Sequence, residues 1–275
     1  MSLDLDERQR AMLEEMHVRV WWPEAAEPEA LPVTAQVVSS APPPVARPAV
    51  AVMQAQPAAP AGLAPGGAID ELQSMDWPAL AGTIGACTAC GLCTGRKAPV
   101  FQPEAGARQA DWLVVGEPPD EQEERAGSAF AGQSGQLMDN MLRALGLARN
   151  GSGGTGARLS NVVKCRTVPV RNPQPDELAR CAVYLRREIA LVQPKVILAM
   201  GRFAALSLLG ESAPELAALP FGKLRGKVHL YHGVPLVVTY HPGRLLRAQE
   251  DKAGAWADLC LAQSVVRGGP PGGGA

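Results

Sequence analysis

Residues 111–117 read Asp-Trp-Leu-Val-Val-Gly-Glu, and residues 135–142 read Gly-Gln-Leu-Met-Asp-Asn-Met-Leu. The first segment is a short apolar run that ends at Gly116, which is typical of a buried strand. The second segment has apolar residues at helical spacing and predicts the start of an amphipathic helix. Together they predict one strand–loop–helix unit.

This unit repeats along the chain. Further strands are predicted at residues 159–163, 195–200 and 234–240, and further helices at residues 176–192 and 202–209. Strands that alternate with helices form a largely parallel sheet with helices on both faces. The expected fold is therefore α/β: a three-layer α/β/α domain with a central, mainly parallel four-stranded sheet.

Composition divides the chain into four parts. Residues 1–23 predict a short amphipathic helix that has the character of a docking peptide. Residues 24–67 are dominated by Ala and Pro, which predicts a disordered N-terminal linker. The folded domain is expected at residues 68–265, and a flexible tail at residues 266–275.

The chain has 275 residues and six cysteines, and it shows no apolar run near the roughly 20 residues that span a bilayer. Its first residues lack the basic and apolar regions of a secretory signal. We therefore expect no membrane partner and a cytoplasmic location. Cysteines in that compartment stay reduced, so disulfides are not expected.

Charge is distributed unevenly. Residues 1–30 carry eight acidic and three basic side chains, a net charge of -5, so the remainder carries +4 against the chain total of -1. A local basic group suited to phosphates is predicted near the candidate site, the alternative being an ordinary solvated surface. Its members are Lys164, Arg166, Arg171, Arg244 and Arg247.

Two cysteine pairs form the clearest ligand pattern. They are Cys87-x2-Cys90 and Cys165-x15-Cys181. Four thiolates can hold an iron–sulfur centre or a structural zinc ion, and unmetallated thiols are the third possibility. Cys93 and Cys260 are expected to be spare or buried thiols.

Polar side chains follow the predicted strands where parallel sheets form ligand crevices. Glu117 begins an acidic run through residue 124 that reads as a loop, either solvated or holding a carboxylate at the site. Asn161 has an amide that can read a pyrimidine edge, and His241 can donate to a developing oxyanion. Phe130 is either a core residue or a platform for a flat ring.

The glycine-rich residues 151–156 look at first like a phosphate cradle. They lack the lysine and hydroxyl residue that would follow in such a motif. A flexible connection between a helix and a strand is therefore expected.

Four motifs together resemble the family 4 uracil-DNA glycosylases, the iron–sulfur branch of that superfamily. The likeness covers roughly residues 72–261. The motifs are Gly-Glu-Pro-Pro-Asp at 116–120, Gly-Ser-Ala-Phe-Ala-Gly-Gln-Ser-Gly at 127–135, Asn-Val-Val-Lys-Cys-Arg at 161–166, and His-Pro-Gly-Arg-Leu-Leu-Arg at 241–247. Asp120, Ala129 and Gly243 depart from the family's usual Gly, Pro and Ser or Ala.

The resemblance implies a DNA repair hydrolase that cleaves the N-glycosidic bond of uracil in single- or double-stranded DNA and leaves an abasic site. It implies that Phe130 stacks on the base, that Asn161 reads its edge and that His241 stabilises charge on uracil O2. It also implies that Glu117 positions water or stabilises the sugar cation. The implied ligands of a structural [4Fe–4S] cluster are Cys87, Cys90, Cys165 and Cys181.

The same resemblance implies a surface that contacts DNA. Leu245 and Leu246 match a wedge that fills the vacated base stack, with Arg244 and Arg247 on phosphates. The alternative is a non-catalytic DNA-binding or replication-associated adaptor on the same scaffold. Residues 5–23 faintly resemble the N-terminal peptide of the bacterial clamp-loader psi subunit, so a replication protein is a possible partner of an expected monomer.

Overall fold

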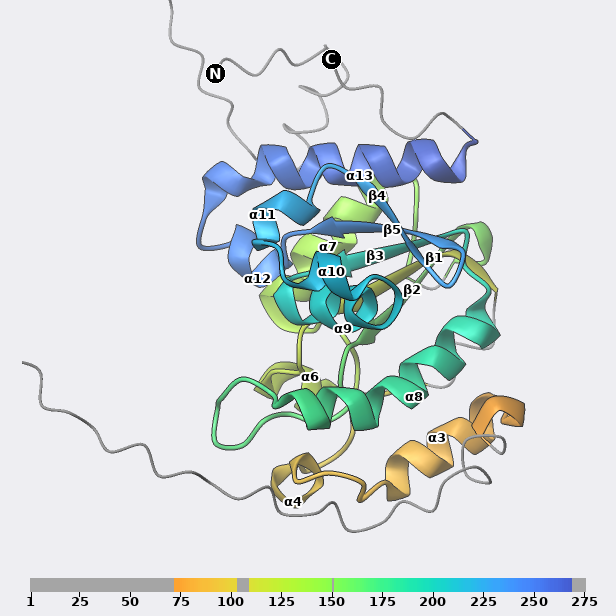
Figure 1. Cartoon of the computed structure of the whole chain (residues 1–275), viewed down its shortest axis with the longest axis vertical. Coiled ribbons are helices and arrows are strands. Elements are labelled where there is room, and N and C mark those ends of the chain that lie inside the picture. Colours follow the sequence, from red (N-terminus) through yellow and green to blue (C-terminus); the bar gives the residue numbers. More distant parts are fainter. Residues whose placement is uncertain (1–71, 103–108, 150, 269–275) are drawn as a thin grey trace, which may run out of the picture. The chain divides into compact units, whose positions relative to one another are not determined.

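The computed structural model describes residues 72–102, 109–149 and 151–268. The predictions for residues 1–23 and 24–67, and the end of the tail, lie outside the described residues. The described residues form an α/β domain, as the strand–helix alternation predicts (Figure 1). No helix among them is both long and apolar enough to cross a lipid bilayer.

Within the described residues the sheet has five strands rather than the four predicted, in the order β2-β1-β3-β5-β4. Four strands are parallel: β1 (Ala110–Gly116), β2 (Gly153–Asn161), β3 (Val196–Met200) and β5 (Val234–Thr239). The missed strand, β4 (Val228–Tyr231), pairs antiparallel with β5 at the sheet edge. The two are joined by His232 and Gly233, both at positive φ, as a tight hairpin turn requires.

The second strand begins earlier than predicted. β2 starts at Gly153, so the glycine-rich residues 151–156 are not simply a flexible connection: their last four residues form the start of a strand. The strand extends to Gly153 because residues of β1 from Ala110 to Gly116 supply its pairing partners. Val162 and Val163 follow the strand and are buried.

Helices cover both faces of the sheet (Figure 1). Alternate residues of β1 make the two faces different: Leu113 and Val115 join the core cluster built with helices α3 (Trp77–Ala86), α8 (Pro175–Val192) and α9 (Arg202–Ser212). Helix α13 (Lys252–Val266) packs on β5 and β3. It is tied to the end of α7 (Gly132–Ala144) by a hydrogen bond from Gln263 to the Leu145 carbonyl.

The remaining elements are short. They are α4 (Leu92–Gly95), α6 (Glu121–Ala126), α10 (Pro214–Ala217), α11 (Phe221–Leu224), α12 (Pro242–Leu245) and the 3-10 helix η1 (Gln249–Asp251). Helix α6 corrects the prediction of an acidic loop, and its residues matter for the site. Because parallel strands end on one edge of the sheet, Gly116 lies opposite Asn161 in the register, next to the start of α9.

Candidate active site and cysteine cavity

The side-chain amide of Asn161 has a fixed orientation. Its Nδ2 donates to the carbonyl oxygen of Glu117 at 2.9 Å and to Oε1 of Glu123 at 3.1 Å. A backbone carbonyl only accepts, so the nitrogen must face these two groups. The Oδ1 atom is buried and has no partner among the described residues. The site therefore presents one preset hydrogen-bond acceptor.

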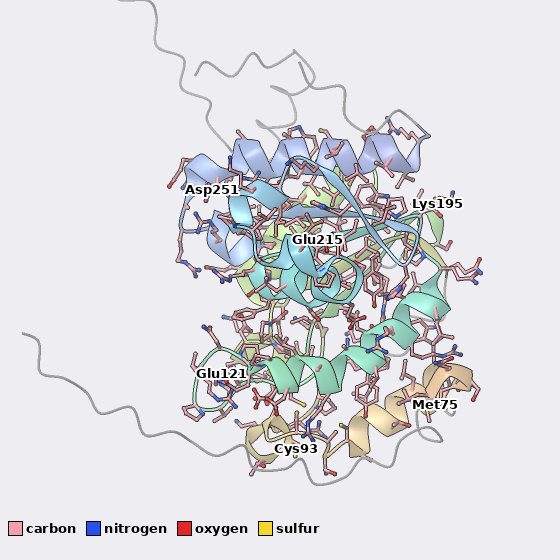
Figure 2. All side chains as sticks on the ribbon, in the orientation of Figure 1. Met75, Cys93, Glu121, Lys195, Glu215 and Asp251 are labelled. Carbon is pink, nitrogen blue, oxygen red and sulfur yellow. The ribbon has the colours of Figure 1, made fainter. Side chains whose placement is uncertain are left out.

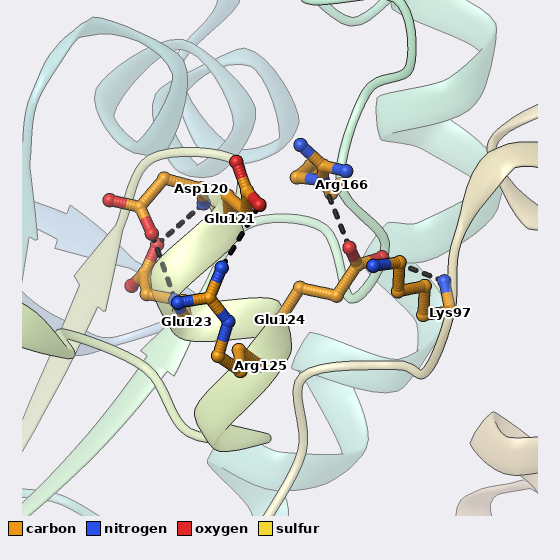
Figure 3. Close-up of polar contacts among 7 residues, drawn as sticks. All are labelled: Lys97, Asp120, Glu121, Glu123, Glu124, Arg125 and Arg166. Carbon is orange, nitrogen blue, oxygen red and sulfur yellow. Dashed lines mark hydrogen bonds and ion pairs between the residues drawn. The ribbon is translucent and has the colours of Figure 1, made fainter.

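Glu123 holds this arrangement together, and the sequence analysis assigned it no role. Its Oε1 also accepts from the backbone N–H of Phe130 at 2.5 Å, and its Oε2 accepts from the N–H of Asp120 at 2.8 Å. The Asp120 side chain accepts from the Glu123 N–H in return, which caps α6 (Figure 3). The sequence does contain a signal for Glu123, because the Asp-x-x-Glu spacing from Asp120 to Glu123 is typical of a capping box. Burial raises the pKa of Glu123.

The carboxylate of Glu117 points at the first turn of α9. Its Oε1 accepts from the N–H of Phe203 at 2.8 Å. Gly201 makes room, because its φ is +100° and a Cβ there would lie 2.2 Å from Oε1. Burial raises the pKa of Glu117 to about 7, against the opposing effects of the Phe203 and Ala204 N–H groups and of Arg202. Glu117 is therefore poised between its two protonation states at neutral pH.

Phe130 and His241 form an aromatic pair. Their ring centroids are 5.2 Å apart with an angle of 22° between the planes. Phe130 is buried at a positive φ of 55°, and a Cβ on Gly116 would lie 2.7 Å from its Cζ. Arg149 donates to the Phe130 carbonyl at 3.0 Å. The ring is therefore held tightly against the end of β1.

His241 is a neutral hydrogen-bond donor. Its Nδ1 accepts from the N–H of Gly243 at 3.2 Å, which leaves the proton on Nε2. Burial lowers its pKa to about 4, while Asp120 raises it and Arg247 lowers it. A Cβ on Gly243 would lie 3.2 Å from Nδ1 and 3.3 Å from Ser134 Oγ, so glycine avoids a tight contact beside the imidazole.

The segment after His241 differs from the predicted wedge. Leu245 is only 2% exposed and belongs to the core, whereas Leu246 is 41% exposed. Of the two leucines predicted to form a wedge, only Leu246 is exposed, because Leu245 faces inward from α12; the wedge itself stays a prediction. The Arg244 guanidinium is paired with Asp251 at 2.7 Å. Arg247 is exposed, and no carboxylate among the described residues is paired with it.

The predicted basic group is not one free surface. Lys164 is buried and forms an ion pair with Glu188. Arg166 is paired with Glu124 and Arg171 with Glu177. Partners on these side chains reduce their capacity to meet phosphates.

All four cysteines of the predicted ligand set line one cavity, between the α3–α4 segment and α8. Cys93, which is expected to be a spare or buried thiol, lies in the same wall; Figure 2 shows it at α4. The thiols lining the cavity are Cys87, Cys90, Cys93, Cys165 and Cys181. Cys260 lies apart from this cavity, on α13.

The donor set suits a thiolate-bound cluster. No disulfide links the described cysteines, and Cys165 and Cys181 are buried. Three cations that can offset thiolate charge also line the cavity: Arg96, Lys164 and Arg180. The backbone N–H of Lys164 donates to Cys181 Sγ at 3.3 Å. Among the residues that the structure describes, no three His, Cys, Asp or Glu side chains form a site for a single metal ion.

Residues 161–165 join the candidate active site to the cysteine cavity. Asn161 belongs to the first and Cys165 to the second, and the residues between them are buried. The Nζ of Lys164 donates to the Asn161 carbonyl at 3.0 Å, inside the same segment. The Asn161 amide and a cavity thiol are therefore carried by one buried stretch of backbone.

Comparison with known proteins agrees with the motifs. A family model described as the uracil DNA glycosylase superfamily matches residues 103–261. A Type-4 uracil-DNA glycosylase of Pyrobaculum aerophilum is 35% identical over 68% of this chain and 93% of that protein. Proteins of the same name from Archaeoglobus fulgidus and Thermotoga maritima are 31% and 33% identical, over 58% and 60% of this chain and 78% and 81% of their own lengths.

Proposed function

The chain belongs to the uracil-DNA glycosylase superfamily, and on that premise we propose that it is an iron–sulfur uracil-DNA glycosylase. The reaction is hydrolysis of the N-glycosidic bond between uracil and deoxyribose in DNA, which leaves an abasic site. The domain at residues 68–265 carries the activity. Base chemistry of this kind requires that the nucleotide leaves the duplex stack and enters a pocket.

One observation carries this proposal: the buried, unpartnered Oδ1 of Asn161. Uracil N3 bears a proton that this oxygen accepts. Cytosine N3 bears a lone pair instead, so the same oxygen repels it. The amide cannot turn its nitrogen toward cytosine, because that nitrogen already donates to Glu117 and Glu123. The pocket therefore favours uracil, with the base stacked on Phe130.

His241 stabilises the leaving group. As the bond breaks, negative charge grows on uracil O2, and the Nε2–H of a neutral imidazole donates to it. The low pKa of His241, about 4, keeps the ring neutral at physiological pH. The donor is held by the Gly243 N–H, so little reorganisation is needed during the reaction.

Glu117 acts on the sugar side. Its carboxylate stabilises the positive charge that develops on the deoxyribose and orients the attacking water. The ionised form does this work. Since burial raises the pKa of Glu117 to about 7, activity rises as the pH passes through neutrality.

Cys87, Cys90, Cys165 and Cys181 hold a [4Fe–4S] cluster, and Cys93 lies beside them. When bound, the cluster supplies cross-links between the α3–α4 segment and α8 rather than reaction chemistry. A structural zinc ion is the alternative that the cysteine spacing leaves open, although no three of these thiols come together as a site for a single ion in the part of the chain that the structure describes. Iron and zinc analysis of the purified protein separates the two.

DNA contact involves the segment after His241. Leu246 fills the gap left by the extruded base, and Arg247 meets a phosphate. Arg244 contributes a second phosphate contact in competition with Asp251. The enzyme acts as a monomer on single- and double-stranded DNA, and residues 5–23 bind a replication protein.

The experiment is uracil release from single-stranded and duplex oligonucleotides by the full chain, with Asn161→Ala and His241→Ala run in parallel. Release by the native chain, lost in both variants, supports the proposed pocket. Tight DNA binding with no release shifts the function to a non-catalytic adaptor. Equal release by native chain and variants refutes the assigned roles.

A further inference from the structure

Arg96 joins the two halves of the cysteine cavity. Its Nη1 donates to Sγ of Cys165 at 2.9 Å. Its Nη2 donates to the carbonyl oxygens of Gly85 at 2.9 Å and Cys87 at 3.0 Å. One planar guanidinium therefore ties the turn that carries the first cysteine pair to a thiol 69 residues later in the chain.

The backbone on both sides of this contact is also held. Glu124 accepts from the N–H of Lys97 at 2.8 Å and from Nε of Arg166 at 3.0 Å (Figure 3). Lys97 follows Arg96 in the chain, and Arg166 follows Cys165. A single buried carboxylate thus fixes the donor and its sulfur acceptor relative to each other. The backbone on both sides of the hydrogen bond is therefore fixed by the fold, although the Arg96 side chain is itself partly exposed.

We propose that Arg96 is a positioning residue for the cluster, which holds the Cys165 ligand and tunes the cluster's reduction potential. This inference rests on the proposed function, since it requires the cluster to be present. A charged donor strengthens a hydrogen bond to a thiolate and withdraws electron density from the sulfur. It thereby stabilises the reduced state and raises the potential, and it slows loss of the ligand.

Arg180 provides a matched control from the same cavity wall. Its Nη1 donates to the carbonyl oxygen of Ala89 at 2.6 Å, between Cys87 and Cys90. It therefore supports the first cysteine turn, as Arg96 does, but through a carbonyl and not through a sulfur. The two arginines separate general support of the turn from a direct effect on a ligand.

The test compares the full-length native chain with Arg96→Gln, Arg96→Lys and Arg180→Gln, all purified without oxygen. The measurements are iron per chain, the rate of iron loss to a chelator, and the reduction potential by protein-film voltammetry. We expect Arg96→Gln to lose iron about tenfold faster, the lower end for lost outer partners of metal ligands, and its potential to shift negative. Arg180→Gln removes the same charge from the cavity wall but no hydrogen bond to a sulfur, so we expect a smaller negative shift of its potential than for Arg96→Gln. For Arg96→Lys we expect a rate of iron loss and a potential between those of the native chain and Arg96→Gln. Lysine keeps the positive charge but cannot make all three hydrogen bonds in the geometry of the guanidinium.

Two outcomes overturn the proposal. In the first, Arg96→Gln matches Arg180→Gln in both iron loss and potential, and the sulfur contact has no special role. In the second, the native chain contains no iron, and the proposed cofactor fails together with the role of Arg96. Uracil release is measured on the same samples. If the native chain releases uracil, the proposed glycosylase activity holds even where the role of Arg96 fails. If Arg96→Gln is insoluble, Arg96→Lys takes its place and is compared with Arg180→Gln in iron loss and potential.

Discussion

The Glu117→Gln substitution tests how the buried carboxylate sets the pH dependence of catalysis. With a pKa of about 7, Glu117 is about one-tenth ionised at pH 6 and about nine-tenths ionised at pH 8. If the carboxylate is the active form, the chemical step of the native enzyme is about tenfold faster at pH 8 than at pH 6. His241, with a pKa of about 4, stays neutral across this range.

The assay is single-turnover release of uracil from a single-stranded oligonucleotide between pH 5 and 9. The glutamine keeps an oxygen that can accept from the Phe203 N–H, so the start of α9 is preserved while the charge is lost. We expect a slower reaction with no rising limb near pH 7. A native profile that is flat from pH 6 to 8, or a rising limb that survives in Glu117→Gln, would refute the reasoning.

The same raised pKa predicts a stability effect. In the unfolded chain Glu117 titrates near 4.5, so the folded state binds its proton more tightly. Its contribution to stability is therefore complete below pH 4.5 and is lost as the pH rises through about 7. The change corresponds to about 3 kcal/mol. The unfolding free energy of the native chain, minus that of Glu117→Gln, should fall by this order between pH 4.5 and 8 in denaturant titrations.

Four further substitutions test other contacts. Glu123→Ala leaves buried N–H donors without an acceptor, so we expect a loss of about 3 kcal/mol in urea unfolding and a lower kcat; native values of both would contradict its positioning role. Leu246→Ala should slow uracil release from duplex DNA more than from single strands, and equal slowing on both substrates would contradict the wedge role of Leu246. Leu245→Ala should instead lower the free energy of unfolding by about 2–4 kcal/mol. Gly116→Ala places a Cβ 2.7 Å from Phe130 Cζ and should lower both the melting temperature and kcat, and a fully active, stable variant would show that the ring moves freely.

The parallel strands β1 and β3 were predictable because buried parallel strands are nearly continuous apolar runs, whereas the glycine-rich start of the parallel strand β2 was missed. Residues 111–115 and 196–200 show this pattern, and both are strands in the structure. β4 lacks it, since three of its four residues are only partly buried or exposed. The available signal was the His232-Gly233 pair, which suits a two-residue hairpin turn between two short runs.

The positions of the candidate site residues were predictable where a motif coincides with a strand end; their roles stay predictions. Glu117 and Asn161 follow directly from strand ends, and His241 follows β5. Burial was not predictable in the same way. The acidic run at residues 117–124 looks solvated in the sequence, yet two of its glutamates are buried by groups from distant segments. Those contacts exist only after the chain has folded, so no local pattern reports them.

The role of Arg96 also depends on contacts that form only in the folded chain. Nothing in its neighbourhood marks it among 26 basic residues, and it acts through a sulfur 69 residues away. The cysteine spacing, by contrast, predicted the cavity, because each pair is local and the two pairs meet through the packing of α8. Local pairs are visible in a sequence, whereas the side chains that join them are not.

Helix α6 limits how this sequence can drift. Glu123 faces Phe130 and Asn161, while its neighbour Glu124 faces the cysteine segments. Because the two glutamates are adjacent, one residue inserted between them would turn one carboxylate relative to the other by about 100° around the helix axis. Exposed Glu121 and Arg125 pair only with each other in i,i+4 fashion on the outer surface, so their identities are open to exchange. In related genes, we therefore expect insertions and deletions in this short helix to be rare, whereas substitutions of its exposed residues should be common.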